Sequence, residues 1–145
     1  MSDAAIQQIL DDVLARAHGS RVTLRLTSAL EVRYESLAPG VPSIFDGAGI
    51  DLGDQPVPKL VKQHQQVVQP DCAACFTDMP HFHAMLAAYG RPGDPMTAQI
   101  VTPVERDGAV IGAMSLHVLG GTRGWDEGEP ELCRDACARI AGLLP

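Results

Sequence analysis

The 145-residue chain has few aromatic side chains, little basic charge and no long apolar run. Aromatic residues make up only 4% of the chain, so its core has to be built from Val, Leu, Ile, Ala and Met. The net charge of -7 leaves no basic face for phosphate groups, which argues against nucleic acid as a partner. No apolar run approaches the ~20 residues that span a bilayer, so we also expect no membrane partner.

Signals for secretion and for common enzyme classes are absent as well. The stretch MSDAAIQQILDDVLARA has acidic residues where a signal peptide would be basic, so we expect a cytoplasmic protein. The segment GGTRG at residues 120–124 lacks the Lys and Ser/Thr of a phosphate-binding P-loop, and the chain has no Gly-x-Ser-x-Gly motif. Four cysteines do not make a disulfide scaffold at this length, and in a reducing cytosol they are thiols, metal ligands or redox groups.

The composition that is present is that of one globular domain, residues 1–145. Apolar residues make up 46% of the chain and charged residues 20%. A chain of this length can bury roughly 68–70% of its unfolded surface and needs no disulfide or metal to fold. We see no internal repeat and no low-complexity segment.

Amphipathic patterns predict a helix at each end of the chain. Over residues 3–18, apolar side chains recur every three or four positions, and Gly19 can end the helix. In the final stretch, residues 125–145, Pro130 suits the first turn of a helix. Its apolar stripe and the two cysteines beside it are Leu132, Ala136, Ile140, Leu143, Cys133 and Cys137.

Two pairs of strands are predicted between these helices. Residues 21–26 alternate between apolar and polar, which is typical of a half-buried strand, and residues 21–37 are predicted to form a hairpin with a loop at 28–30. Residues 97–119 flank Asp107-Gly108, a dipeptide that favours a hairpin turn. The second strand of that pair is apolar on both faces, so we expect it near the centre of a sheet.

The middle of the chain is irregular. Residues 38–56 are rich in Gly and Pro and carry only one weak strand pattern, at residues 43–45. A short helix is predicted at residues 57–65, a short strand at 66–69 and two helical turns at 81–90. The order of helix, two strands, irregular middle, two strands and helix predicts an α+β fold with an antiparallel sheet.

Three segments, in this order, resemble parts of a GAF domain, a small-molecule sensor fold related to PAS. QQVVQPDC at residues 65–72 is similar to the short strand and aspartate-led loop of that family. TPVERDGAVIGAMSLHV at residues 102–118 resembles its strand–turn–strand signature, with Gly112 in the second strand. GWDEGEPELCRDACARIAGLLP at residues 124–145 resembles its closing helix.

The resemblance implies an antiparallel sheet of about six strands, with the terminal helices on one face and the irregular segment over a ligand pocket on the other. It implies a sensor or regulatory domain for a small organic ligand and a homodimer through the terminal helices. No output domain is expected after the last helix, so a signal would pass to another chain. The residues expected to face the ligand are Tyr34, Phe45, Phe82, Met85, Thr102 and Ser115.

The stretch DCAACFTDMPHFH at residues 71–83 keeps a metal- or haem-binding sensor open as an alternative. Thiolate and imidazole groups from Cys72, Cys75, His81 and His83 would suit zinc or iron. The one-residue gap between the histidines departs from the usual zinc spacing of three to five. The other interpretation places these residues in a pocket wall or a loop, so the cofactor stays unknown among none, zinc, iron and haem.

A thiol-based enzyme is the second alternative. Cys72 and Cys75 can form a redox pair only if a thiol pKa is lowered, and the neighbouring Asp71 acts in the opposite direction. The GAF family includes free methionine sulfoxide reductases, and resemblance to them would require a cysteine in the loop YGRPGDPMTAQ, residues 89–99, which has none. Cys133 and Cys137 have the spacing of core residues, and His117, alone in a strand, is interpreted as structural.

Overall fold

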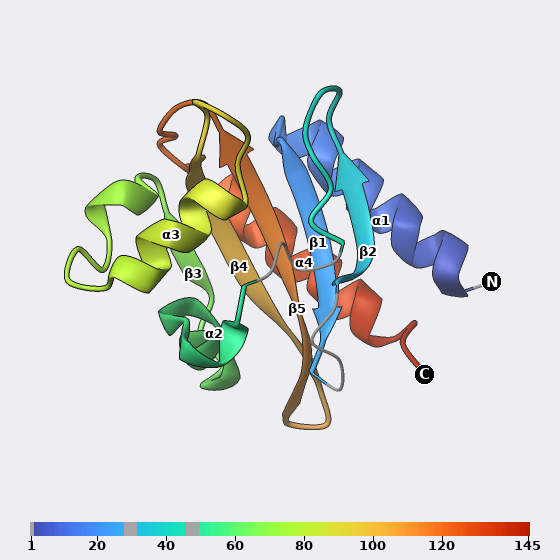
Figure 1. Cartoon of the computed structure of the whole chain (residues 1–145). Helices are drawn as coiled ribbons and strands as arrows, with labels where there is room; N and C mark the ends of the chain where they lie inside the picture. Colours follow the sequence, from blue (N-terminus) through green and yellow to red (C-terminus); the bar gives the residue numbers. More distant parts are fainter. Residues whose placement is uncertain (1, 28–31, 46–49) are drawn as a thin grey trace.

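The computed structural model describes residues 2–27, 32–45 and 50–145. A five-stranded antiparallel sheet with the order β2-β1-β5-β4-β3 runs through its centre (Figure 1). The strands are β1 Arg21–Leu26, β2 Val32–Leu37, β3 Val67–Gln69, β4 Met96–Arg106 and β5 Ala109–Leu119. The helices are α1 Ser2–Ala17, α2 Pro56–Lys62, α3 Pro80–Ala88 and α4 Gly128–Ala141, with short 3-10 turns at Leu52–Asp54 and Cys72–Ala74.

The predicted α+β class is confirmed, but the sheet of the described residues has five strands instead of about six. The strand expected at residues 43–45 is not formed there. The Glu35 carboxylate instead accepts hydrogen bonds from Ser43 Oγ at 2.6 Å and from the Ile44 backbone N–H at 2.8 Å. A side chain of β2 therefore takes the place of a neighbouring strand. The hairpin loop predicted at residues 28–30 lies outside the described residues.

The hairpin of β4 and β5 has the turn that its sequence predicts. Asp107 and Gly108 both have positive φ, 54° and 80°, as a two-residue turn between twisted antiparallel strands requires. Arg106 and Ala109 close the register on either side. β5 pairs with β1 on one edge and with β4 on the other, so its predicted central position is confirmed.

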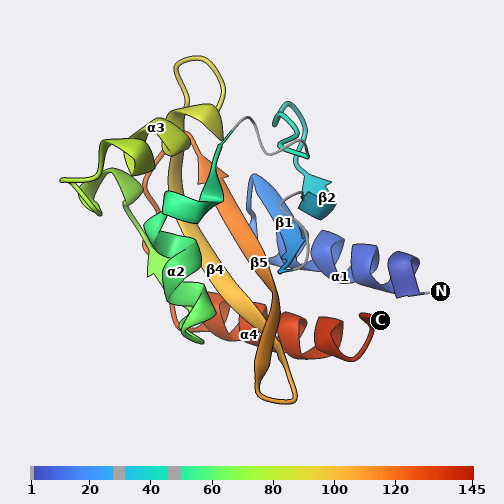
Figure 2. The ribbon, with the colours of Figure 1, turned by 60° about the horizontal axis from the view of Figure 1, so that its bottom comes forward.

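The terminal helices α1 and α4 lie side by side on one face of the sheet (Figures 1 and 2). Alternate side chains of β1, β4 and β5 point to these helices, among them Leu24, Ile100, Met114 and Leu116. Cys133, Ala136, Cys137 and Ile140 of α4 are all buried in the same core. The apolar band of α4 is therefore covered within one chain, and dimerisation through these helices stays a prediction.

The opposite face of the sheet is covered on its β4 and β3 side by α2, α3 and the turns beside them (Figure 1). This middle segment has its own apolar core, which includes Val57, Val61, Cys72, Phe82, Leu86 and Tyr89. Two apolar cores therefore lie on the two faces of one sheet. None of the helices in the described ranges is long and apolar enough to cross a bilayer.

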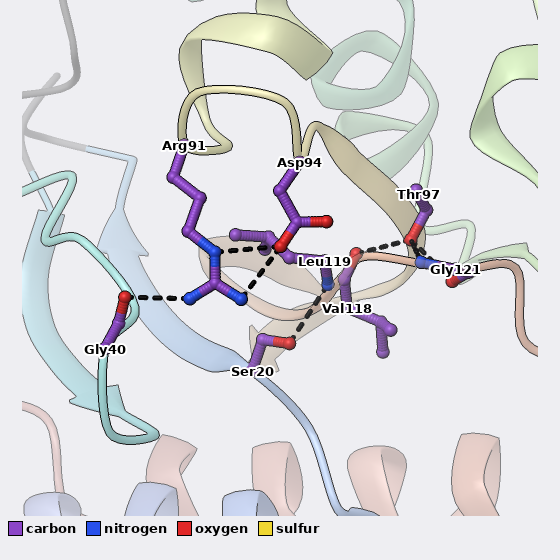
Figure 3. A network of polar contacts seen from close by, with 8 residues as sticks. All are labelled: Ser20, Gly40, Arg91, Asp94, Thr97, Val118, Leu119 and Gly121. Atoms are coloured by element: carbon purple, nitrogen blue, oxygen red, sulfur yellow. Dashed lines mark hydrogen bonds and ion pairs between the residues drawn. The ribbon is translucent and has the colours of Figure 1, made fainter.

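Polar contacts fix the end of the sheet that lies next to the end of α3 (Figure 3). The Arg91 guanidinium contacts Asp94 Oδ2 at 2.8 Å from both Nε and NH2, and its NH1 donates to the Gly40 carbonyl at 2.8 Å. Ser20 Oγ accepts a hydrogen bond from the Leu119 N–H at 3.0 Å. These contacts join the chain after β2, the loop between α3 and β4 and the ends of β1 and β5, so they hold the end of α3 over the sheet.

Candidate ligand-binding pocket

A cavity of about 200 Å³ lies between the second face of the sheet and the middle segment. Strands β1, β4 and β5 form its floor, with Thr23, Arg25, Gln99, Val101, Ser115 and His117. The roof comes from α2, α3 and the chain before them, with Ile44, Gln55, Val57, Val61, Met85 and Tyr89. Mainly apolar walls with a few placed polar groups are typical of small-molecule sites.

The floor is polar because the polar side of β1 faces inward. The register places Arg21 opposite His117, Thr23 opposite Ser115 and Arg25 opposite Ala113. Arg21 is 0% and Thr23 1% exposed. The alternation of β1 predicts a half-buried strand with a solvated polar side, and that expectation is wrong, because the middle segment covers this side.

Arg21 is a buried cation that contacts His117 of the cavity floor. Its Nε donates to Nδ1 of His117 at 3.1 Å, its NH1 donates to the Pro42 carbonyl at 2.9 Å, and its NH2 donates to the Tyr89 carbonyl. These three acceptors are neutral. Burial lowers the pKa of Arg21 to about 10, although the charge of Glu35 acts in the other direction. Arg21 therefore keeps its positive charge at neutral pH.

His117 is held neutral in one tautomer. Its side chain is buried, and this burial, with the charges of Arg21 and Arg25, holds its pKa well below the ordinary value of 6.5. Because Nδ1 accepts the Arg21 N–H, the ring proton has to lie on Nε2. The Tyr89 ring stacks on the imidazole with 5.9 Å between centroids, and its hydroxyl accepts a hydrogen bond from Arg25 at 3.0 Å. His117 thus gives the cavity wall a fixed imidazole.

Gln55 brings an amide to the roof. It precedes α2, its backbone N–H donates to the Leu52 carbonyl at 3.2 Å, and its Nε2 donates to the His81 carbonyl at 3.1 Å. The residue is 3% exposed. Its Oε1 is buried and has no hydrogen-bond partner among residues 2–27, 32–45 and 50–145. The roof therefore carries an acceptor that the described chain does not satisfy.

Solved structures share this arrangement of sheet, terminal helices and covering segment. GAF3 from Slr1393 of Synechocystis, in its photoproduct state, matches with a TM-score of 0.76 at 17% identity, over 97% of this chain and 91% of that one. The GAF domain of an Acinetobacter phosphoenolpyruvate-protein phosphotransferase matches with a TM-score of 0.70 at 12% identity, over 98% and 81% of the two chains. JSC1_58120g3, in its far-red-absorbing dark state with bound biliverdin, matches with a TM-score of 0.75 at 14% identity, over 99% of this chain and 89% of that one.

The chain has the GAF fold. The resemblance inferred from the three sequence segments is confirmed at this level, and at such low identities the likeness establishes the fold alone. No family model matches the chain, and no curated protein matches it in sequence. The cavity lies on the face of the GAF sheet that the terminal helices leave free, where the resemblance implied a pocket.

Two of the six predicted contact residues line the cavity of this GAF fold. Met85 reaches it from α3 and Ser115 from β5. Their contact with a ligand stays a prediction. Phe82 is 0% exposed but belongs to the core under α3, where it packs edge-on against Phe76 with 5.0 Å between ring centroids. Phe45 is 50% exposed and does not line the cavity.

The other two predicted residues lie on the helix side of the sheet. Tyr34 is opposite Leu24 in the register, packs against the core under α1 and α4, and donates its hydroxyl hydrogen to Asp3. Thr102 is opposite Met114, which belongs to the same core, and its Oγ1 accepts from Gln66 at 2.9 Å. Neither residue lines the cavity, because strand register places both on the face away from it.

Sequence reasoning missed most of the polar lining. The half-buried pattern of residues 21–26 predicts that the polar side of the strand, with Thr23 and Arg25, faces solvent, and a lone histidine in a strand predicts a structural His117. One sequence signal could have found Thr23 and Arg25: β5 is apolar on both faces, so both faces of the sheet are covered there, including those of the neighbouring strand β1. Gln55 had no local signal, because its position in the roof depends on a contact with the distant His81 carbonyl of α3.

The four predicted metal ligands are not assembled around one point. The Cys72 thiol donates to Gln69 Oε1 at 3.6 Å, His81 Nε2 lies 2.8 Å from the Asp54 carbonyl, and His83 Nε2 lies 3.0 Å from the Cys75 carbonyl. Within the described ranges, no three His, Cys, Asp or Glu side chains form a group that could hold a metal ion. Backbone carbonyl oxygens and the Gln69 side-chain amide instead contact the thiol and imidazole groups that would bind a metal ion.

The thiols have the wrong acidity for nucleophilic chemistry. Burial raises the pKa of Cys72 to about 12 and that of Cys133 to about 12, and it also raises the pKa of Cys75 and Cys137. A catalytic thiol needs a lowered pKa, because the thiolate is the reactive form. The direction of these shifts opposes the thiol-reductase alternative.

Proposed function

We propose that this GAF-fold chain is a sensor or regulatory domain that binds a small organic molecule in the cavity between the sheet and the middle segment. The observation that carries the proposal is the cavity itself, about 200 Å³ with apolar walls and placed polar groups. Its volume lies below the ~300–1,000 Å³ of pockets for drug-sized ligands, which favours a metabolite-sized occupant. An open-chain tetrapyrrole such as biliverdin needs more room.

The lining also restricts the charge of the ligand. Among the described lining residues, Arg25 and Lys62 are cationic and none is acidic. Arg21 adds a third positive charge behind His117. A cationic ligand would therefore find no acidic partner among these lining residues, and a neutral or anionic molecule is favoured.

A ligand in this position would contact both the floor and the roof. It can then shift the packing of α2 and α3 on the sheet by its differential affinity for two arrangements of these helices. We further propose, on the sequence pattern, that the chain works in the cytoplasm and forms a homodimer through α1 and α4. The mass of the protein in solution, measured by light scattering, tests the dimer.

A thermal-shift screen tests ligand binding. The panel contains amino acids, nucleobases and small organic acids, and a ligand at 100 times its Kd adds about 2.7 kcal/mol to the free energy of unfolding. Ala113→Leu fills the cavity floor and should abolish the shift, whereas Ala138→Leu, on the exposed side of α4, should preserve it. A panel with no active member, or a shift that survives Ala113→Leu, would contradict the proposal.

A further inference from the structure

Gln55 Oε1 is the one buried side-chain nitrogen or oxygen without a hydrogen-bond partner in the described part of the chain. An unsatisfied buried acceptor costs about 1–3 kcal/mol, so folded proteins rarely retain one without a reason. The residue that carries it lines the cavity. The missing partner is therefore to be sought in what the cavity binds.

The orientation of this amide is fixed by its neighbours. Nε2 donates to the His81 carbonyl at 3.1 Å, and an exchanged amide would place Oε1 against that carbonyl oxygen. The backbone cannot turn easily either, because Pro56 restricts the preceding residue to the extended region, where Gln55 has φ -78° and ψ 139°. Oε1 thus remains an unsatisfied acceptor on a residue of the cavity roof.

We propose that the ligand carries an N–H or O–H group that donates a hydrogen bond to Gln55 Oε1, so that Gln55 selects molecules with such a donor. This inference rests on the proposed function and names the chemistry of its ligand. The floor has the complementary character, because the Nε2–H of His117 is a donor. A fitting molecule therefore has a donor at one end and an acceptor, such as a carboxylate or carbonyl, at the other.

A pair of isosteric acids tests this selection. Pyrrole-3-carboxylate and furan-3-carboxylate have the same shape and charge, but the first has a ring N–H where the second has a ring oxygen, across the ring from the carboxylate. In NMR titrations, the wild-type chain should bind pyrrole-3-carboxylate at least ~10-fold more tightly, since a tenfold change equals about 1.4 kcal/mol. Gln55→Met keeps the bulk but lacks the acceptor, and it should bind the two acids within about twofold of each other. Gln8→Met, the same change at an exposed position of α1, should keep the preference.

A second measurement needs no variant and holds even if Gln55→Met does not fold. Pyrrole-3-carboxylate should shift the side-chain amide signals of Gln55 in the wild-type chain, and furan-3-carboxylate should not. Equal wild-type affinities, or a preference that survives in Gln55→Met, would overturn the inference. The proposed function would still stand if Ala113→Leu abolished the binding of both acids. Binding of neither acid would also overturn the inference, and the metabolite panel would then decide the proposed function separately.

Discussion

Arg21 Nε donates a hydrogen bond of 3.1 Å to Nδ1 of His117, which lies in the cavity floor. The two residues are 96 positions apart in sequence and face each other in the register of β1 and β5. The bond gives a buried guanidinium one of its acceptors and fixes the imidazole tautomer. The charge of Arg21 also opposes protonation of His117, so Arg21 helps to keep the imidazole neutral.

The first prediction concerns the pH dependence of stability. The folded-state pKa of His117 lies well below 6.5. As the pH falls through 6.5, the His117 side chain therefore binds a proton in the unfolded chain but stays neutral in the native chain. The contribution of the neutral His117 to the free energy of unfolding is present above this pH and is lost below it, by at most ~1.4 kcal/mol per pH unit. Urea unfolding at pH 7.5, 6.5 and 5.5 should show this slope. His117→Gln, which keeps an acceptor for Arg21, should flatten it.

His18→Asn is the control for this measurement. His18 is exposed and has a φ of 51°, a conformation that asparagine tolerates. This variant should keep the wild-type slope below pH 6.5. Equal slopes for the wild-type chain and His117→Gln would show that His117 is protonated in the fold.

The second prediction concerns Arg21 itself. Arg21→Met fills similar space but removes the donors to His117, Pro42 and Tyr89. Apolar replacement of a buried charge can be neutral, but here it leaves three acceptors without their donor, so we expect a loss of about 2–4 kcal/mol at pH 7.5. Urea unfolding measures it. Arg16→Met, in an exposed pair with Asp12, should change stability by less than about 1 kcal/mol.

The fold was accessible from the sequence wherever local pattern and tertiary packing agree. α1 and α4 carry continuous apolar stripes, and the turn at Asp107 and Gly108 requires the positive φ that this dipeptide tolerates. The strand expected at residues 43–45 does not form, because the Glu35 carboxylate accepts the hydrogen bonds of the Ser43 hydroxyl and the Ile44 backbone N–H. A side-chain bond of this kind leaves no periodic signal.

The site was less accessible because its chemistry depends on which face each strand turns inward. Tyr34 and Thr102 are expected to face the ligand because they lie in strands below the middle segment, but the register places them under the terminal helices. Arg21 and Thr23 look like a solvent face until the middle segment covers them. Periodicity separates the two faces of a strand, but it does not say which distant segment covers the polar one.

The third prediction concerns thiol reactivity. Burial raises the pKa of Cys72 to about 12, which leaves about one thiol in 10⁴ ionised at pH 8. Cys75 is half-buried, so iodoacetamide should modify it first in the native chain, as followed by mass spectrometry. In urea all four cysteines should react at similar rates. Native modification of Cys72 as fast as that of Cys75 would return the redox pair to consideration.

The last prediction concerns Gly90, which follows the Tyr89 of the cavity wall. A Cβ at this position would collide with the Asp94 carbonyl oxygen and lie 2.6 Å from Pro95 Cα. Both are backbone atoms of the turn that enters β4, so they cannot move aside as a flexible side chain would. Gly90→Ala should cost about 2 kcal/mol or more in urea unfolding, and it should weaken ligand binding by displacing Tyr89 and the carbonyl that Arg21 contacts.

Gly124→Ala, where no atom lies within 4 Å of the added Cβ, should stay within about 0.5 kcal/mol of the wild-type chain. Equal stabilities of the two variants would mean that the turn relaxes freely and does not position the cavity wall.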